Sequence, residues 1–187
     1  MIAINVFFDM DGVLTVYERD AYRAPDYKWR QLGGHYFRSV KPDQKAIEVF
    51  RVLSNTANVN TFVLTAVLNE GPIMLEQITD KIQWLNEHIP EVDPSKQFIP
   101  SVSAKNRTIQ AVLFQNKDHL SPSDILIDDY NPNLLDWANA GGTAVKYINQ
   151  LNHAASYKGI ILPNDMPADD IAQLFDTISR TALFREY

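Results

Sequence analysis

The arrangement of apolar runs along the chain constrains the fold more than any other feature. Short runs that end at polar residues alternate with segments of helical periodicity. The runs cover residues 2–8, 61–65, 97–99, 125–128, 143–148 and 159–162. Their nearly continuous apolar character is typical of parallel strands that are covered on both faces. Strands and helices in alternation predict an α/β fold with a doubly wound parallel sheet.

Helix signals punctuate the segments between these runs. The predicted helices cover residues 42–53, 72–90, 108–114, 131–140 and 167–184. Pro42 and Pro72 suit the first position of a helix, and Gly141 suits the position just after a helix end. By helical spacing, the expected buried stripe of the second helix consists of Leu75, Ile78, Ile82, Trp84 and Leu85.

Residues 14–40 interrupt this alternation and predict a small cap, inserted into a core domain made of residues 1–13 and 41–187. Because the insertion follows the first strand at once, we expect it over the carboxyl end of the sheet, where open α/β sheets bind ligands. Its aromatic residues have two interpretations. They form a small hydrophobic core of the cap's own, or they form a platform on which a base stacks. The candidates for base stacking are Tyr17, Tyr22, Trp29 and Tyr36.

Composition excludes several classes of function. The net charge of −6 argues against a protein that grips a nucleic acid polymer, because such binding requires a basic face. The absence of cysteine excludes disulfides, thiolate zinc sites and a cysteine nucleophile. No run approaches the roughly 18 apolar residues that cross a bilayer, and residues 2–8 have the character of a core strand rather than a signal peptide. We therefore expect a cytoplasmic protein that does not bind a membrane. The sequence predicts no oligomeric state.

The segment Asp9-Met10-Asp11-Gly12 follows the first predicted strand directly and carries the sharpest chemical signal. Two carboxylates two residues apart, where the backbone leaves the strand, can both face one site, and Gly12 permits the tight turn. One carboxylate can attack while its neighbour handles the proton of the leaving group. Such oxygen ligands also suit Mg²⁺. The alternative is an ordinary strand-to-loop turn, in which Asp and Gly are common.

This segment, extended by one residue to Asp9-x-Asp11-Gly12-Val13, resembles the first motif of the haloacid dehalogenase superfamily. Three later motifs of that superfamily have matches in the same order: an apolar strand ending at Thr65, a lysine after the next strand, and an apolar strand ending in the pair Asp128-Asp129. The resemblance covers most of the chain. It implies a magnesium-dependent phosphatase in which an aspartyl-phosphate forms on the nucleophile Asp9.

The resemblance also implies roles for the later motifs. The Thr65 hydroxyl and the backbone N–H of Ala66 would hold the phosphoryl oxygens, and a lysine would neutralise charge during transfer. Lys105 is favoured for that role over Lys96 and Lys117, which are expected at the wrong edge of the sheet.

The metal ligands implied by the resemblance are Asp9, the carbonyl of Asp11 and one of the paired acids. We favour Asp129 as the direct ligand, with Asp128 supporting the site from behind. The alternatives are a solvated pair at a strand end or a helix N-cap, but two acids that close an uncharged apolar strand are better explained by a cation.

At a finer level the chain resembles the 5'(3')-deoxyribonucleotidases, on residues 9–14, 126–133, Trp137 and 147–149. This implies a nucleoside monophosphate as the substrate. The alternative within enzymes is a phosphatase of sugar phosphates or other small metabolites. A receiver-like signalling module is not favoured, because it would carry its motifs in a different order. A degenerate module that binds phosphate without turnover has no support, because all four motif positions of this chain hold competent residues.

Overall fold

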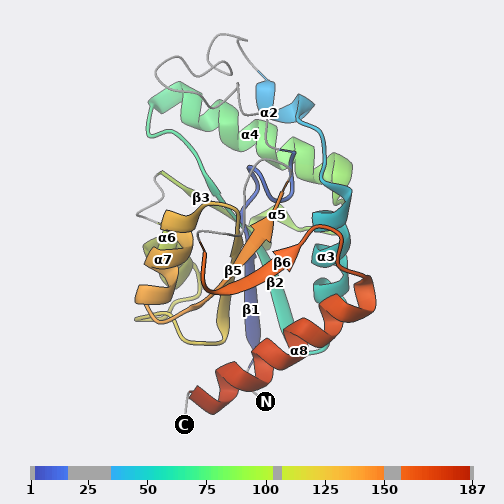
Figure 1. Cartoon of the computed structure of the whole chain (residues 1–187). Coiled ribbons are helices and arrows are strands. Elements are labelled where there is room, and N and C mark those ends of the chain that lie inside the picture. Colours follow the sequence, from blue (N-terminus) through green and yellow to red (C-terminus); the bar gives the residue numbers. More distant parts are fainter. Residues whose placement is uncertain (1–2, 17–34, 103–106, 150–156, 186–187) are drawn as a thin grey trace.

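The computed structural model describes residues 3–16, 35–102, 107–149 and 157–185 of the 187-residue chain. Its strands are β1 (Ile4–Phe8), β2 (Val59–Ala66), β3 (Phe98–Ser101), β4 (Asp124–Asp128), β5 (Thr143–Ile148) and β6 (Ile160–Pro163). They form one sheet in the order β3-β2-β1-β4-β5-β6, and every pairing is parallel (Figure 1). The predicted fold class, a doubly wound parallel α/β sheet, is confirmed.

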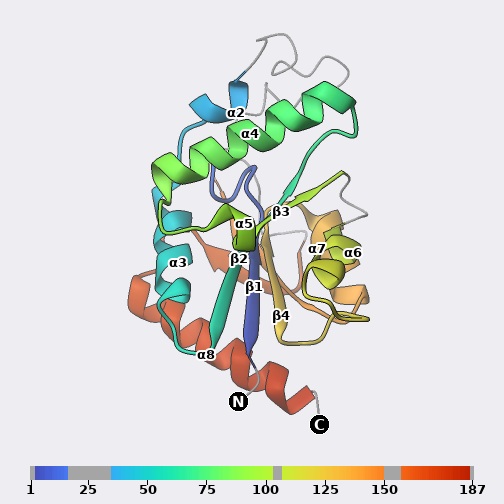
Figure 2. The same ribbon diagram turned by 180° about the vertical axis from the view of Figure 1, so that it is seen from behind.

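The described helices lie on both faces of this sheet and over its ends. They are α2 (Tyr36–Ser39), α3 (Gln44–Ser54), α4 (Gly71–His88), α5 (Pro94–Gln97), α6 (Arg107–Phe114), α7 (Asn131–Asn139) and α8 (Ala168–Arg185). Helices α6 and α7 cover one face and α3 lies on the other, as the front and rear views show (Figures 1 and 2). Helix α3 begins one residue after Asp43, whose side chain caps it by accepting from the N–H groups of Lys45 and Ala46. Pro42 therefore precedes the cap residue rather than opening the helix.

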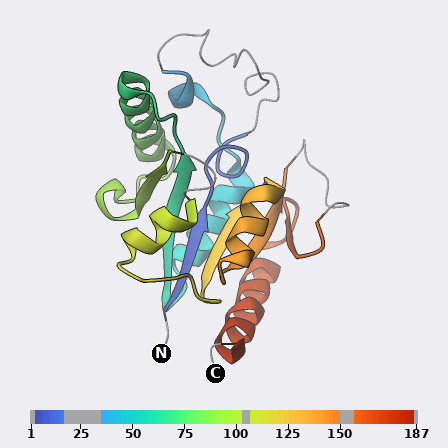
Figure 3. The ribbon, with the colours of Figure 1, turned by 90° about the vertical axis from the view of Figure 1, so that its left-hand side faces the viewer.

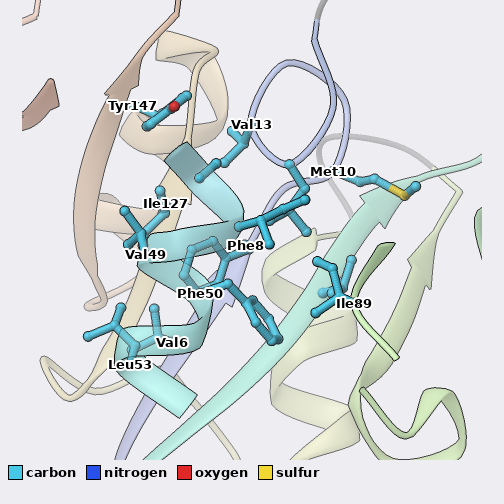
Figure 4. Packing of buried hydrophobic residues seen from close by; sticks show 14 of the residues in the cluster. Val6, Phe8, Met10, Val13, Val49, Phe50, Leu53, Ile89, Ile127 and Tyr147 are labelled. Atoms are coloured by element: carbon cyan, nitrogen blue, oxygen red, sulfur yellow. The ribbon is translucent and has the colours of Figure 1, made fainter. Parts of the chain in front are cut away.

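Strand side chains alternate between two hydrophobic clusters, one on each face of the sheet. Val6 and Phe8 of β1 point into the larger cluster with α3 and α8, where Phe8 packs on Phe50 at 5.0 Å between ring centres (Figure 4). Phe7, between them, points into the cluster with α6 and α7, where it packs on Trp137. Burial on both faces explains why the strands read as continuous apolar runs.

Helix α4 lies across the carboxyl ends of the strands, with α2 beside it, while α8 lies toward the opposite end (Figure 3). The sequence predicts an apolar buried stripe on this helix, and the structure differs in part. Trp84 and Leu85 are buried as predicted, but Leu75 is 63% exposed. The buried face instead includes Gln77, Asp80 and Lys81. The inner face of α4 is therefore partly polar, because part of it faces the polar ends of the strands.

Two contacts tie the end of the predicted cap to α4. The indole of Trp84 donates to the main-chain oxygen of Val40 at 2.7 Å, and His35 pairs with buried Asp80 at 2.8 Å. The central part of the insertion, residues 17–34, lies outside the described residues, so the cap boundaries stay a prediction. None of the described helices has the length and apolar character needed to span a bilayer.

We expect Trp137→Ala to lower the free energy of unfolding by about 3–5 kcal/mol, because it leaves a large cavity in the second cluster. It also removes the hydrogen bond from the indole to the main-chain oxygen of Asp124. Leu135→Ala, on the exposed side of the same helix, should change the value by no more than about 0.5 kcal/mol. Urea unfolding measures both, and equal losses would contradict the packing described here.

Candidate active site

The site is centred where β1 and β4 lie side by side, which is the point where the strand order reverses. Ligands bind at such switch points in doubly wound sheets. The backbone N–H of Asp9 donates to the carbonyl of Ile127 at 2.9 Å, so Asp9 and Asp128 both emerge at the carboxyl ends of neighbouring strands. Carboxylate oxygens of Asp9, Asp128 and Asp129 all lie within 4.8 Å of one another.

The turn after β1 is compact and held from within. The N–H and hydroxyl of Thr15 both donate to the carbonyl of Met10, at 2.9 and 3.0 Å. Gly12 has a φ of +86°, a conformation that side-chain-bearing residues rarely adopt. This geometry brings Asp11 back beside the end of the sheet.

Arg107, the first residue of α6, bridges two of the clustered carboxylates. Its Nη2 lies 2.9 Å from Oδ1 of Asp9, and its Nη1 lies 2.8 Å from Oδ2 of Asp128. The side chain is almost fully buried. A guanidinium suits this place because its rigid fork can donate to two acceptors at once.

Asp128 is completely buried and accepts hydrogen bonds at both carboxylate oxygens. The N–H of Tyr130 donates to Oδ1 at 2.8 Å, while Arg107 and the amide of Asn133 both donate to Oδ2 at 2.8 Å. Asp129 is only partly buried. Three protein donors therefore hold the Asp128 carboxylate in a fixed orientation.

Burial raises the pKa of Asp9 from 3.8 to about 7, although the adjacent Arg107 guanidinium lowers it. The carboxylates of Asp128 and Asp11 raise it further. Burial raises the pKa of Asp128 as well. The cationic side chains of the protein thus compensate the negative charge of these carboxylates only in part.

A divalent cation fits this donor set. The three clustered acids offer only hard oxygen ligands, which Mg²⁺ prefers, and the raised pKa of Asp9 indicates a place where added positive charge is favourable. The structure contains an acidic cluster able to hold a metal ion.

Lys81 of α4 is fully buried and connects the first and second motifs. Its Nζ donates to Oδ2 of Asp11 at 2.5 Å, to the hydroxyl of Thr65 at 2.6 Å and to the main-chain oxygen of Ala66 at 3.0 Å. It also lies 4.6 Å from the ring centre of Phe37. These acceptors engage all three ammonium hydrogens, so Lys81 fixes Asp11 and Thr65 relative to one another.

The structure thus brings together Asp9, Asp11, Thr65, Asp128 and Asp129, the described residues predicted for catalysis and metal binding. Lys105 lies outside the described residues, as do Tyr17, Tyr22 and Trp29. The two rejected lysines are elsewhere: Lys117 pairs with Asp124 at the amino end of β4, and Lys96 pairs with exposed Asp93.

Tyr36, one of the residues predicted to stack a base, is buried. It is 9% exposed and packs with Phe37, Val40 and Leu68 in a small cluster at the base of the cap. This burial favours the interpretation of Tyr36 as part of a hydrophobic mini-core.

Sequence reasoning missed Arg107 and Lys81. Arg107 stands two residues after Lys105 and just before the helix predicted at 108–114. The third motif of the superfamily is a lysine, so an arginine was not considered for this role. Lys81 lies three residues after Ile78 and four before Leu85, so it falls on the buried face of its helix. A charged residue at such a position is the signal that could have found it.

Comparison with known proteins supports the fold of this site. No protein-family model and no curated protein matches the chain by sequence. A solved structure of a haloacid dehalogenase-like protein from Mesorhizobium loti is 12% identical, covers 97% of this chain and 88% of its own, and has a TM-score of 0.61. The D,D-heptose 1,7-bisphosphate phosphatase of B. bronchiseptica is 12% identical, with 93% of this chain and 99% of that one covered and a TM-score of 0.60. A haloacid dehalogenase-like hydrolase from Streptococcus pneumoniae is 13% identical, with 92% and 98% of the two chains covered and a TM-score of 0.55. The heptose bisphosphate phosphatase was solved with magnesium and phosphate. The chain shares the fold of the haloacid dehalogenase-like phosphatases.

We expect Asp9→Asn to raise the stability of the metal-free protein at pH 7–8, by roughly 1–3 kcal/mol. Burial raises the pKa of Asp9 to about 7 in the folded state, from an ordinary value of 3.8. The wild-type protein therefore loses stability as pH rises from about 4 to 7, and asparagine, which carries no charge, avoids this loss.

Thermal unfolding in chelator at pH 4.5 and 7.5 measures the effect, which should nearly vanish at the lower pH. Asp136→Asn, on the exposed side of α7, is the control and should change little at either pH. A destabilised Asp9→Asn protein at pH 7.5 would show that the carboxylate is well compensated without metal.

Proposed function

We propose that the protein is a Mg²⁺-dependent phosphomonoester hydrolase in which Asp9 is the nucleophile. The observation that carries this proposal is the meeting of Asp9 and Asp11 with Thr65 and the Asp128-Asp129 pair at the carboxyl end of one parallel sheet. The shared fold of haloacid dehalogenase-like phosphatases supports the same reaction class.

Asp9, the main-chain carbonyl of Asp11 and Asp129 are the proposed ligands of Mg²⁺. Asp128 is less suited to direct coordination, because three donors already engage its two oxygens. It orients the site instead. When bound, Mg²⁺ supplies positive charge that offsets the repulsion between the phosphoryl group and the carboxylates.

Asp9 attacks phosphorus and Asp11 manages the proton. The chain contains no cysteine, and the Asp9 carboxylate already lies fixed by the N–H of Met10 and by Arg107. Attack forms a bond from Asp9 to phosphorus and breaks the bond to the alcohol, to which Asp11 gives a proton. Asp11 then takes a proton from the water that hydrolyses the aspartyl-phosphate.

The remaining groups position the phosphoryl group and neutralise its charge. Because the Thr65 oxygen accepts from Lys81, its own hydrogen is available for a phosphoryl oxygen, and the N–H of Ala66 is the second proposed donor. Arg107, beside the nucleophile, takes the charge-neutralising role that the sequence assigns to Lys105. Lys105 stays a candidate for a further contact to phosphate. Phosphoryl transfer needs mainly positioning and charge stabilisation of this kind.

We expect Asp9→Asn and Asp11→Asn to fail differently. Asp9→Asn should abolish turnover and the phosphoenzyme, because the nucleophile is gone. Asp11→Asn should lower kcat by on the order of 10²–10⁴-fold, because proton transfer is lost while attack is retained. Mass spectrometry of acid-quenched enzyme should locate the added phosphate on Asp9 in the wild type. Turnover by Asp9→Asn protein, or full turnover in excess chelator, would contradict the mechanism.

A nucleoside monophosphate is the proposed substrate, on the resemblance to the 5'(3')-deoxyribonucleotidases. The burial of Tyr36 removes one of four residues proposed to stack the base, leaving Tyr17, Tyr22 and Trp29 as the proposed contacts. The second candidate is a sugar phosphate, which the likeness to a heptose bisphosphate phosphatase favours.

We expect deoxynucleoside monophosphates to be hydrolysed with a higher kcat/KM than sugar phosphates. Purified protein with Mg²⁺ is assayed for phosphate release from 5'- and 3'-nucleotides, hexose and heptose phosphates, and a simple aryl phosphate as the control for basal chemistry. A sugar phosphate that turns over more than about tenfold faster than every nucleotide, a difference of about 1.4 kcal/mol in transition-state binding, would replace the nucleotidase by the second candidate.

A further inference from the structure

The residue just after β5, Asn149, links two segments of the proposed metal site. Its Nδ2 donates to the main-chain oxygen of Gly12 and to Oδ2 of Asp129, both at 2.9 Å. The two hydrogens of a side-chain NH₂ group suffice for these two acceptors. One amide therefore joins the turn after β1 to the acid after β4.

Gly12 and Asp129 are also in direct contact. A Cβ atom at Gly12 would stand 2.9 Å from Cγ and from both carboxylate oxygens of Asp129, a separation that real side chains do not tolerate. The carboxylate of Asp129 thus packs against the bare Cα of Gly12. Packing against the turn and the hydrogen bond from Asn149 together restrict its orientation.

Lys146 holds the main chain of the same residue. This lysine is 2% exposed, and its Nζ donates to the main-chain oxygen of Asp129 at 2.8 Å and to Oδ1 of Asn131 at 2.6 Å. β5 and the residue that follows it therefore hold Asp129 at two points, the backbone through Lys146 and the carboxylate through Asn149.

We infer that Asn149 is a positioning residue for the metal, because it holds the carboxylate of Asp129 beside Gly12, the residue that follows Asp11. This inference rests on the proposed function, because it takes Asp129 and the Asp11 carbonyl as ligands. Fixing the Asp129 carboxylate and the turn at Gly12 before the ion arrives removes conformational freedom in advance, and loss of such an outer-shell partner typically weakens metal binding 10–100-fold. Because Asn149 acts through Asp129 and Gly12, its loss raises the Mg²⁺ concentration required and leaves the rate at saturating Mg²⁺ nearly unchanged.

Asn149→Leu tests the inference, because leucine has a similar branched shape and no hydrogen-bond donor. Titration calorimetry with Mg²⁺ alone should give a Kd about 10–100-fold higher than that of the wild type. In the presence of substrate, the Mg²⁺ concentration for half-maximal rate should rise by the same factor while kcat stays within about threefold. Asn149→Ala, a smaller perturbation of packing, should give the same shift and serves if the leucine variant does not fold.

Asn5→Leu is the matched control. The amide of Asn5 also donates twice, to Oε1 of Gln115 at 2.8 Å and to Oδ1 of Asp124 at 2.9 Å, but at the opposite end of the sheet. The Asn5→Leu variant should have a lower thermal stability than the wild type and an unchanged Kd for Mg²⁺. An unchanged Kd in both Asn149 variants, or an equal rise in Asn5→Leu, would overturn the positioning role while leaving the proposed function intact. A wild-type protein that binds no Mg²⁺ would instead overturn the proposed function, and the inference with it.

Discussion

Burial of carboxylates at the end of a parallel sheet is the constraint on which the rest of this structure depends. Asp9 and Asp128 are 3% and 0% exposed, and the burial of an unpaired ion costs several kcal/mol. Because β1 and β4 are adjacent, the two acids are neighbours, and a nearby cation must offset their electrostatic repulsion. Arg107 offsets part of this repulsion, because its planar guanidinium pairs with both carboxylates. The remaining imbalance makes this cluster of acids a favourable place for a cation.

The same constraint determines the character of α4. A helix laid over the ends of strands that carry acids cannot present an apolar face there, since polar groups would lose their partners. Lys81 instead forms an ion pair with Asp11, and the side chain of Gln77 accepts a hydrogen bond from the N–H of Leu68 at 2.8 Å. Asp80 on the same face pairs with His35. The fully buried apolar residues of the helix, Trp84 and Leu85, lie toward its C-terminal end, where they join the main hydrophobic cluster.

The sequence predicts strand positions and strand-end acids well, because both follow from local patterns. Apolar runs mark each strand within a few residues, and parallel pairing then gathers the polar residues that end them, such as Asp9 and Thr65. The cations that compensate these acids were not predicted, since Lys81 and Arg107 reach the site through long side chains from helices whose docking depends on the whole fold. Leu75 was misplaced for the same reason: periodicity gives the spacing of a helix face but not which of two faces the sheet will cover. The role of Tyr36 depended on packing that composition does not encode.

The contacts that build the site join residues far apart in the chain. Asn149 and Gly12 are separated by 137 positions, and Lys81 and Asp11 by 70. Closing such long loops costs conformational entropy before these contacts can stabilise the fold, and proteins dominated by contacts of this kind generally fold slowly. No excised fragment lacking either end of such a pair can contain the complete arrangement. A refolding chain should therefore regain its secondary structure before this arrangement of side chains is complete.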